Sequence, residues 1–581
     1  MASQISLGTL IPAEKQSLFL KLGVKLLDKI MGLSRMQRLY EQHQMQNLSK
    51  EAFADKLLEV LNVTVEGEQE MLDKIPATGP VVIASNHPFG GLEGVILARA
   101  IAKKRPDLKV LANVGLQIFS ELEDYFIFTN PLSERDPRNG PSLRSCMAQV
   151  KNGGALMLFP SGRVSYYRKE HKRIGEHEWN RIVAKLIDRG DANYVPIFVE
   201  GFNSNKFYRI GRIYYRLRMF MLGRELLNKT NQTIKLCAGH PVPAKHIRTA
   251  GDGNAQAALC RALSYGVAEH WQSAWPTIES SKFEPLAEQV SGDLILKEIA
   301  ALPQEQHLVA YKDYDVYYGF QHQCPNIVTE IARLRELVFR EHDEGSGQPI
   351  DTDKFDATYT QLFIVNRTKG QIIGAYRMGQ TDKLLENGGI ENLYLSQMFD
   401  FQPTFINQTE PCLEMGRSFL VPEYQKSFYG LYLLWRGIGA FACKFPQYRR
   451  LYGTVSISKL YDKRSIAVME KAMVKTRPDV KPKTPYNLPL HPELVDFDKQ
   501  YDIKINVTAF LKALEQDGKD VPVLLKHYMR LGAEFYCLGM DSSFADTPGL
   551  LLCVDLLNIP DKLAKQYLAE GLEGYRSYHA S

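Results

Sequence analysis

The chain has 581 residues, which is too long for a single hydrophobic core and indicates two to four domains. Its formal net charge of +5, from 71 Lys and Arg against 66 Asp and Glu, is too small to argue for nucleic-acid binding by itself. The eight cysteines include no Cys-x-x-Cys pair, so neither a zinc ribbon nor a disulfide framework is indicated, and a reducing compartment is expected.

The start of the chain has no basic region followed by an apolar stretch, so we expect no secretory signal. The most apolar helical segment, residues 430–442, contains Arg436 and is shorter than the roughly 20 residues that a membrane span requires. We therefore expect any contact with a membrane to be made at its surface.

Residues 14–42 form a basic amphipathic stretch within an N-terminal helical segment, residues 1–55. Apolar residues recur at helical spacing and lysines and arginines lie between them; the apolar positions are Leu18, Leu22, Leu26, Ile30 and Leu33. Such a helix can lie in a bilayer surface with its lysines on anionic headgroups. The alternative is an ordinary helix that packs on its own domain.

A strand, a Pro/Gly turn and a helix are predicted from Val81 to Lys104, and they bring a histidine and a carboxylate together. His87 follows the strand, and Glu93 falls in the first turn of the helix, where a carboxylate suits the helix dipole. A carboxylate bonded to one imidazole nitrogen leaves the other free to take a proton from an acceptor hydroxyl. The alternative is a structural or solvated pair.

Further strands alternate with helical stretches through the rest of the first half, which predicts a parallel or mixed α/β sheet with its site at the strand ends. The expected strand segments are residues 109–114, 126–131, 155–159 and 194–201. We expect this domain to span residues 56–245, and a polar helical linker to span residues 246–290.

The second half, residues 291–581, is predicted to begin with a helix at 331–341 and an antiparallel hairpin of strands 361–365 and 371–378. A strand near 412–422 then leads through a polar turn into a long helix. These elements in this order resemble the N-acetyltransferase-like fold, and the resemblance implies that backbone amides at the start of that helix receive the phosphate or pantetheine of an acyl donor.

Charged residues on these elements form the candidate site of the second half. Glu414 on a central strand can orient an ammonium group, and Arg377 or Arg417 can clamp a carboxylate. Arg335 and Asp356 are further candidates. The alternative for each of these residues is a buried structural salt-bridge network.

Three motifs in order resemble the glycerolipid acyltransferase superfamily over residues 60–245. They are Asn86-His87, Phe159-Pro-Ser-Gly162-Arg163 and Val195-Pro196. The resemblance implies that His87 is the base for acyl transfer to a lipid hydroxyl and that Asn86, Gly162 and Arg163 contact substrate. Two positions depart from the family pattern, because the acid follows the histidine by six residues instead of five and Ser161 replaces the motif glutamate.

The second half resembles ornithine N-acyltransferases and, more distantly, acyl-homoserine-lactone synthases, which implies an N-acetyltransferase-like fold. The matching motifs are Arg335-x-x-x-Phe339, Asp356, Gly374-Ala-Tyr-Arg377, Glu414-x-Gly-Arg417 and Arg530-x-Gly-Ala533. The whole chain therefore resembles a bifunctional ornithine-lipid synthase of two α/β domains. In that scheme the second domain joins a 3-hydroxyacyl chain to the amine, and the first acylates the 3-hydroxyl.

This resemblance implies ornithine or a related amino acid as acceptor, and acyl carrier protein or acyl-CoA as donor, with no other cofactor, no metal and no nucleic acid. It also implies a peripheral position on the cytoplasmic face of the inner membrane. Two alternatives stay open. One is a lysophospholipid acyltransferase whose second half only binds the acyl carrier, and the other is a non-catalytic membrane-interaction protein.

Overall fold

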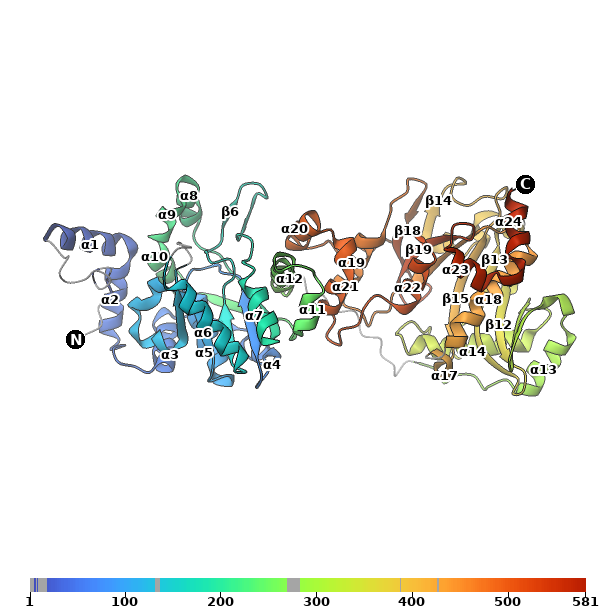
Figure 1. The fold of residues 1–581 in the computed structure, drawn as a ribbon, viewed down its shortest axis with the longest axis horizontal. Coiled ribbons are helices and arrows are strands. Elements are labelled where there is room, and N and C mark those ends of the chain that lie inside the picture. Colours follow the sequence, from blue (N-terminus) through green and yellow to red (C-terminus); the bar gives the residue numbers. More distant parts are fainter. Residues whose placement is uncertain are drawn as a thin grey trace. The chain divides into compact units, whose positions relative to one another are not determined.

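A computed structural model describes residues 5, 6, 8, 18–130, 136–268, 283–386, 388–425 and 428–580. The chain forms two compact units, each with its own sheet (Figure 1). The first unit combines Met1–Ser273 with Leu490–Lys519, and the second combines Ala274–Pro489 with Asp520–Ser581. The predicted class, α/β with two domains, is confirmed.

The first unit contains a seven-stranded mixed sheet. In spatial order its strands are β1 (Thr64–Glu66), β9 (Thr233–Ala238), β8 (Asn193–Val199), β2 (Val81–Ser85), β5 (Ala155–Leu158), β3 (Lys109–Asn113) and β4 (Phe126–Thr129). Only β8 and β9 run antiparallel. Every residue of β2 is buried, as is typical of a central parallel strand, and this strand delivers His87 to the edge of the sheet.

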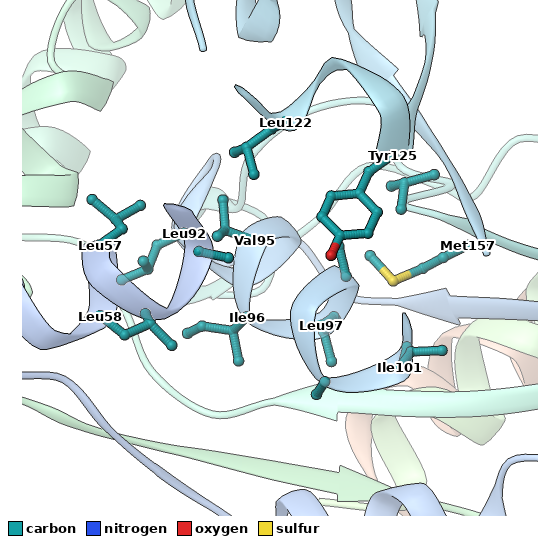
Figure 2. Packing of buried hydrophobic residues seen from close by; sticks show 14 of the residues in the cluster. Leu57, Leu58, Leu92, Val95, Ile96, Leu97, Ile101, Leu122, Tyr125 and Met157 are labelled. Carbon is teal, nitrogen blue, oxygen red and sulfur yellow. The ribbon is translucent and has the colours of Figure 1, made fainter. Parts of the chain in front are cut away.

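Helix α5 (Leu92–Lys104) follows β2 and buries most of its surface in the core of the first unit. Figure 2 shows Val95, Ile96 and Ile101 of this helix packed among residues of α3 (Lys50–Leu61), β5 and the 3-10 helix η4 (Ser120–Tyr125). Because α5 is held on several sides, the position of Glu93 in its first turn is set by the core.

The predicted helical stretch at residues 14–42 is two helices, α1 (Leu18–Met31) and α2 (Leu33–Gln42), and residues 14–17 lie outside the described part. Gly32 separates them with a φ of +83°, which a residue with a side chain rarely adopts. Helix α2 buries Leu33 and two further apolar residues, whereas α1 leaves Leu22, Leu26, Leu27 and Ile30 exposed. None of the described helices is long and apolar enough to cross a membrane.

The first unit has further described helices and one short hairpin. They are α4 (Glu68–Lys74), α6 (Asn139–Lys151), α7 (Ile182–Gly190), α8 (Asn205–Ile213), α9 (Tyr215–Met219), α10 (Leu222–Leu227), α11 (Ala244–Arg248) and α12 (Gly253–Gly266), with hairpin strands β6 (Tyr166–Arg168) and β7 (Arg173–Gly175).

Two helices from the second half of the sequence complete the first unit. They are α20 (Pro492–Tyr501) and α21 (Ile503–Leu514), which fall inside the range expected for the second domain. Helix α20 packs against α12, and α21 packs against α11. The sequence alone did not indicate this exchange, because an amphipathic helix does not specify which core will bury its apolar face.

The second unit contains an eight-stranded sheet. Its strands in spatial order are β10 (His307–Tyr311), β11 (Tyr314–Gly319), β12 (Thr360–Asn366), β13 (Gln371–Gln380), β15 (Leu413–Leu420), β16 (Arg450–Ser456), β19 (Thr547–Asp555) and β18 (Glu534–Asp541). The predicted hairpin is β12–β13, and the predicted helices are α14 (Pro325–Arg340) and α18 (Phe428–Lys444).

Strands β15 and β16 are the one parallel pair in this sheet as described. They are paired only from Leu413 to Met415 with Leu451 to Gly453. Beyond that point no pairing joins them, and this divergence opens the centre of the sheet.

Candidate active sites

His87 and Glu93 are brought together as the sequence predicted. Nδ1 of His87 lies 2.9 Å from Oε1 of Glu93, whose side chain is fully buried. The same carboxylate accepts hydrogen bonds from the backbone N–H groups of Phe89, Gly90 and Gly91 at 2.8–2.9 Å. The turn between strand and helix is therefore folded around the Glu93 carboxylate, which holds the imidazole in one orientation.

Each residue of the His87–Glu93 pair stabilises the charged form of the other. Burial raises the pKa of Glu93, but His87 and the backbone amides outweigh burial and lower the pKa to about 2. Burial also disfavours the imidazolium, but the Glu93 carboxylate outweighs it and raises the pKa of His87. Glu93 is thus an ionised carboxylate that pairs with the Nδ1 side of His87, and Nε2 of His87 is the nitrogen that can accept a proton from a hydroxyl.

A second buried carboxylate, Glu176, supports the histidine backbone and was missed in the sequence. It accepts hydrogen bonds from the His87 backbone N–H and from Nε1 of Trp179. Burial raises the pKa of Glu176. The Phe159 ring stacks on the imidazole with 4.5 Å between centroids. Glu176 stands in a run of charged residues, and such a run normally indicates a solvated surface, so only the folded chain shows that it is buried.

A cavity of about 810 Å³ adjoins His87 and has mostly apolar walls. Those walls include residues of α2, β3, α5 and α10, such as Met36, Val110, Leu92 and Leu226. A largely apolar volume of this size, with His87 in its wall, can accommodate acyl chains next to the histidine.

Gly162 and Arg163 line this cavity, as predicted for substrate-binding residues. Gly162 has a φ of +62° in the turn after β5, which places Arg163 beside His177. Burial, assisted by Arg163, lowers the pKa of His177 to about 4, so this histidine is neutral. Asn86 is not among the lining residues.

The Asn86 side chain links two strands of the sheet instead of lining the cavity. Its amide nitrogen donates to the carbonyl oxygen of Val199, and its amide oxygen accepts from the N–H of the same residue, at 2.9 and 2.7 Å. Both polar atoms are therefore used to join the ends of β2 and β8. This link fixes the strand end that carries His87.

Glu414 is the centre of the second candidate site and lies on β15. Its carboxylate accepts hydrogen bonds from the Tyr359 hydroxyl and from the backbone N–H groups of Leu395, at 2.6 Å, and Tyr394, at 3.2 Å. Burial raises the pKa of Glu414 to about 7, although these donors favour the carboxylate. A carboxyl group with this pKa can exchange a proton near neutral pH.

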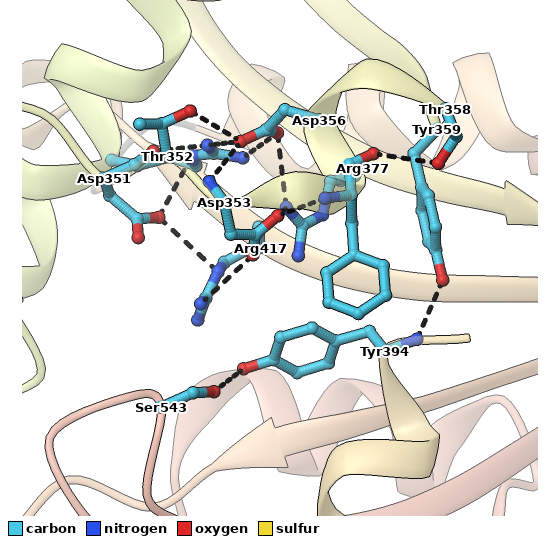
Figure 3. A network of polar contacts seen from close by, with 12 residues as sticks. Asp351, Thr352, Asp353, Asp356, Thr358, Tyr359, Arg377, Tyr394, Arg417 and Ser543 are labelled. Carbon is cyan, nitrogen blue, oxygen red and sulfur yellow. Dashed lines mark hydrogen bonds and ion pairs between the residues drawn. The ribbon is translucent and has the colours of Figure 1, made fainter. Parts of the chain in front are cut away.

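The predicted residues Arg335, Asp356 and Arg377 form a buried ion-pair network. Figure 3 shows Asp356 and Arg377 of this network together with Tyr359, whose hydroxyl donates to Glu414. Arg335 binds the Asp356 carboxylate through two nitrogens at 3.0 and 2.8 Å, and Arg377 contacts Asp353 and Asp356. Asp356 also accepts from Gln361. Arg335 and Asp356 do not line the neighbouring cavity. We therefore interpret these two residues as part of a structural ion-pair network and not as substrate contacts.

Arg417 differs from its neighbours because its ion pairs are loose. Its nitrogens lie 3.5 Å from Asp351 and 3.7 Å from Asp353, and the guanidinium carbon lies 5.0 and 4.3 Å from the ring centroids of Tyr394 and Phe544. The backbone φ of Arg417 is +49°, at a shift in register between β13 and β15. A non-glycine residue in this region costs about 1–2 kcal/mol, and such strain is often found at functional sites.

A cavity of about 520 Å³ occupies the divergence of β15 and β16. Glu414, Arg377 and Arg417 line it together, and so does Glu344, which the sequence analysis missed. The predicted donor site at the start of the long helix involves residues 426 and 427, which lie outside the described part of the chain.

Two known families match the chain. The family described as "Acyltransferase" matches residues 39–272, and the family described as "Acetyltransferase (GNAT) domain" matches residues 334–436. These ranges fall on the sheets that carry the His87 and Glu414 sites, respectively. The predicted order, a glycerolipid-acyltransferase-like half before an N-acetyltransferase-like half, is confirmed.

A protein of Bacteroides thetaiotaomicron named glycine N(alpha)-acyltransferase is 30% identical over 299 residues, 47% of this chain and 86% of its own length. The chain belongs to this acyltransferase family. A lyso-glycine lipid O-acyltransferase of Phocaeicola vulgatus is 27% identical over 199 residues, 33% of this chain and 68% of its own length. This acyltransferase thus combines in one chain similarities to two separate bacterial enzymes.

Solved structures similar to the acyltransferase include two CoA-dependent acyl-homoserine lactone synthases. BjaI matches at 9% identity with a TM-score of 0.23 and MesI at 12% identity with a TM-score of 0.23. Each match covers 46% of this chain, with 90% of BjaI and 95% of MesI.

Proposed function

We propose that the protein makes a two-chain aminolipid from an amino acid by two acyl transfers, one in each unit. The observation that carries this proposal is the presence of two independent sites in one chain. Each site has a buried carboxylate, and each adjoins its own large cavity. A second unit that only bound an acyl carrier would not require the Glu414 arrangement.

In the first transfer, the amino group of the acceptor attacks the thioester carbonyl of a 3-hydroxyacyl donor in the second unit. A C–N bond forms and the C–S bond breaks. Glu414, with a pKa of about 7, takes the proton that the amine must lose, and the departing thiolate of the carrier receives a proton in turn. Arg417, whose guanidinium lies near the rings of Tyr394 and Phe544, binds the carboxylate of the acceptor.

In the second transfer, the 3-hydroxyl of the mono-acylated product attacks another acyl thioester in the first unit. Nε2 of His87 takes the hydroxyl proton as the C–O bond forms, and returns a proton to the sulfur as the C–S bond breaks. Glu93 stabilises the imidazolium between these events. No enzyme nucleophile is needed, because the thioester is already activated.

Ornithine or a related amino acid is the proposed acceptor, from the motif resemblance. Glycine is the second candidate, because two relatives carry the name glycine N(alpha)-acyltransferase. The proposed donors are acyl carrier protein and acyl-CoA. The protein is proposed to lie on the cytoplasmic face of the inner membrane, attached through α1.

Lipid extracts of cells that express the protein, analysed by mass spectrometry, test the proposal. We expect a new amino acid lipid with one amide-linked and one ester-linked chain. Altered phospholipids without an aminolipid would favour the lysophospholipid alternative, and unchanged lipids would exclude both activities. Purified protein supplied with ornithine or glycine and a 3-hydroxyacyl donor then identifies the acceptor.

A further inference from the structure

Three apolar side chains are exposed on the segment that joins α8 to α10 in the first unit. They are Ile213, Leu217 and Phe220, here called the α8–α9 tip, and they are 81%, 44% and 41% exposed. Three large apolar side chains so close in the chain are unusual on a surface that faces only water, and they indicate a binding surface.

The core of the first unit does not require the α8–α9 tip. Helix α8 is anchored by other residues, since Phe207 and Tyr208 are buried and pack with Val164. The Ser204 side chain caps the helix start, and Glu225 accepts hydrogen bonds from Ser204 at 2.8 and 2.6 Å. The segment is therefore well held at its base while its apolar end is presented outward.

The charged residues of the segment that carries the tip are all basic. Residues 201–224 contain six lysines and arginines and no aspartate or glutamate. Lys206, Arg209 and Arg224 are exposed. Apolar side chains surrounded by basic ones fit a surface that offers both hydrocarbon and anionic groups, which is the chemistry of an anionic lipid bilayer.

The tip is connected to the cavity beside His87. Helix α10, which follows it, packs against α1 and α2 (Figure 1). Residues of both segments line the cavity, with Met31 and Met36 from the N-terminal helices and Met219 and Leu222 from the tip side. The apolar walls of the cavity are thus continuous with the two elements that expose apolar side chains.

We infer that the α8–α9 tip inserts into the acyl region of an anionic membrane, while Lys206 and Arg209 contact the headgroup phosphates. Lipid chains then pass between the bilayer and the cavity beside α10. An acidic carrier protein is the competing occupant, but such a partner would match the basic residues and would leave the exposed apolar side chains without a role.

Co-sedimentation with vesicles of phosphatidylglycerol and phosphatidylcholine tests the inference. The variant Ile213→Ser/Leu217→Ser/Phe220→Ser should bind at least about tenfold more weakly, because three apolar side chains no longer enter the bilayer. Lys206→Glu/Arg209→Glu keeps the tip and should weaken binding only where phosphatidylglycerol is present. Ile505→Ser changes an isoleucine that is 80% exposed on α21, and should bind normally.

Circular dichroism and activity on a detergent-dispersed short-chain substrate show whether each variant is folded. Vesicle binding that is unchanged in both the folded triple Ser variant and the folded Lys206→Glu/Arg209→Glu variant would overturn the inference. If the triple Ser variant binds vesicles normally but loses affinity for an acyl carrier protein, the inference is overturned and the carrier protein is the occupant of the tip.

A separate observation concerns Glu344, which lines the cavity of the second unit. Its side chain is buried, and its one hydrogen bond among the described residues comes from the Ser456 hydroxyl at 3.1 Å. No Lys, Arg or His nitrogen of the described chain lies within 4.0 Å of it. An unpaired buried carboxylate is costly unless a cation comes to it or it takes up a proton.

Arg417 and Lys459 are both close enough to act on the charge of Glu344, and of these two cations only Arg417 lines the same cavity. An amino acid held by its carboxylate at Arg417 can therefore extend a side chain toward Glu344. We propose that Glu344 binds the cationic end of that side chain and so selects a basic amino acid over glycine. This second inference rests on the proposed N-acyl transfer in the second unit.

Steady-state kinetics with ornithine and with norvaline, its uncharged analogue, test this role. Glu344→Gln should raise the KM for ornithine about tenfold or more, as expected for a lost charged hydrogen bond, and leave kcat and the KM for norvaline unchanged. An equal effect on both acceptors, or none, would overturn the role of Glu344. Absence of acylation of every acceptor by the wild type would instead refute the proposed function.

Discussion

Glu493 Oε2 lies 2.7 Å from Arg261 Nη2, although the two residues come from different halves of the sequence. The same Arg261 nitrogen donates to the backbone oxygen of Glu176, whose carboxylate accepts the His87 backbone N–H. Helix α20 therefore belongs to the support of the first active site. The chain passes from the first unit into the second, back into the first at Leu490–Lys519, and into the second again.

Glu493→Ala should destabilise the first unit by about 3–5 kcal/mol, because Arg261 would stay buried without its partner. Chemical unfolding monitored by circular dichroism measures this loss. The double variant Glu493→Leu/Arg261→Met removes both charges and should recover most of it. As a control, Glu59→Ala in the exposed pair with Lys56 should cost less than about 1 kcal/mol. Equal effects of the two alanine variants would refute the structural role of Glu493.

His87→Ala should lower ester formation by about 10²–10⁴-fold, the usual contribution of a general base. The mono-acylated amino acid should then accumulate, because the amine-acylating site lies in the other unit. Glu93→Gln should also reduce ester formation, since the neutral amide cannot stabilise the imidazolium. Mass spectrometry of lipids from expressing cells measures both products. Normal yields of the two-chain lipid in His87→Ala cells would disprove the assignment.

Glu414→Gln should abolish both lipids in cells, because the first unit would lack its substrate. Added mono-acylated amino acid should restore the two-chain product in the purified variant, as the first site is intact. Glu423→Gln changes an exposed glutamate and should have no effect. If the variant cannot acylate the added intermediate although it is folded, the two sites are not independent.

The stability of the protein should depend on Glu344 as pH changes. Burial raises the pKa of Glu344 from 4.5 to about 7, so the folded state keeps a proton that the unfolded state loses in this interval. The free energy of unfolding is therefore largest below pH 4.5, where both states carry the proton. It falls as the pH rises to about 7, the pKa of the folded state. Glu344→Gln should be more stable than wild type by about 1–3 kcal/mol near pH 8, and equal near pH 4. Thermal unfolding across this range is the measurement.

Helix α1 exposes Leu22, Leu26 and Ile30, with exposures of 60%, 61% and 49%. Changing all three to Ser should move the protein from the membrane fraction toward the soluble fraction. High salt should release the wild type only partly, because the lysines contribute about 1 kcal/mol each near an anionic surface and the leucines contribute the rest. Leu294→Ser, in the second unit, is the control. Unchanged binding to anionic liposomes by the folded triple variant would show that α1 does not attach the protein to the membrane.

Much of the fold follows from patterns that are local in the sequence. The continuous apolar run of β2, the turn glycines and the position of Glu93 predict a strand, a turn and a helix. Because Glu93 comes only six positions after His87, the strand, turn and helix bring the two side chains near each other, and the packing of α5 in the core fixes that position. The hairpin β12–β13 was predictable for the same reason, since its register depends on one short turn.

Tertiary structure alone decided what surrounds these elements. A run of charged residues is normally solvated, yet Glu176 is buried because packing around Trp179 and His87 closes over it. Arg335 and Asp356 were candidates for substrate binding, and only their mutual contact shows how completely they neutralise each other. The transfer of α20 and α21 to the first unit had no local signal, because ion pairs between distant segments depend on which surfaces meet. Sequence determines the chemistry and the local geometry of a residue, whereas burial and charge pairing arise from contacts that only the folded chain makes.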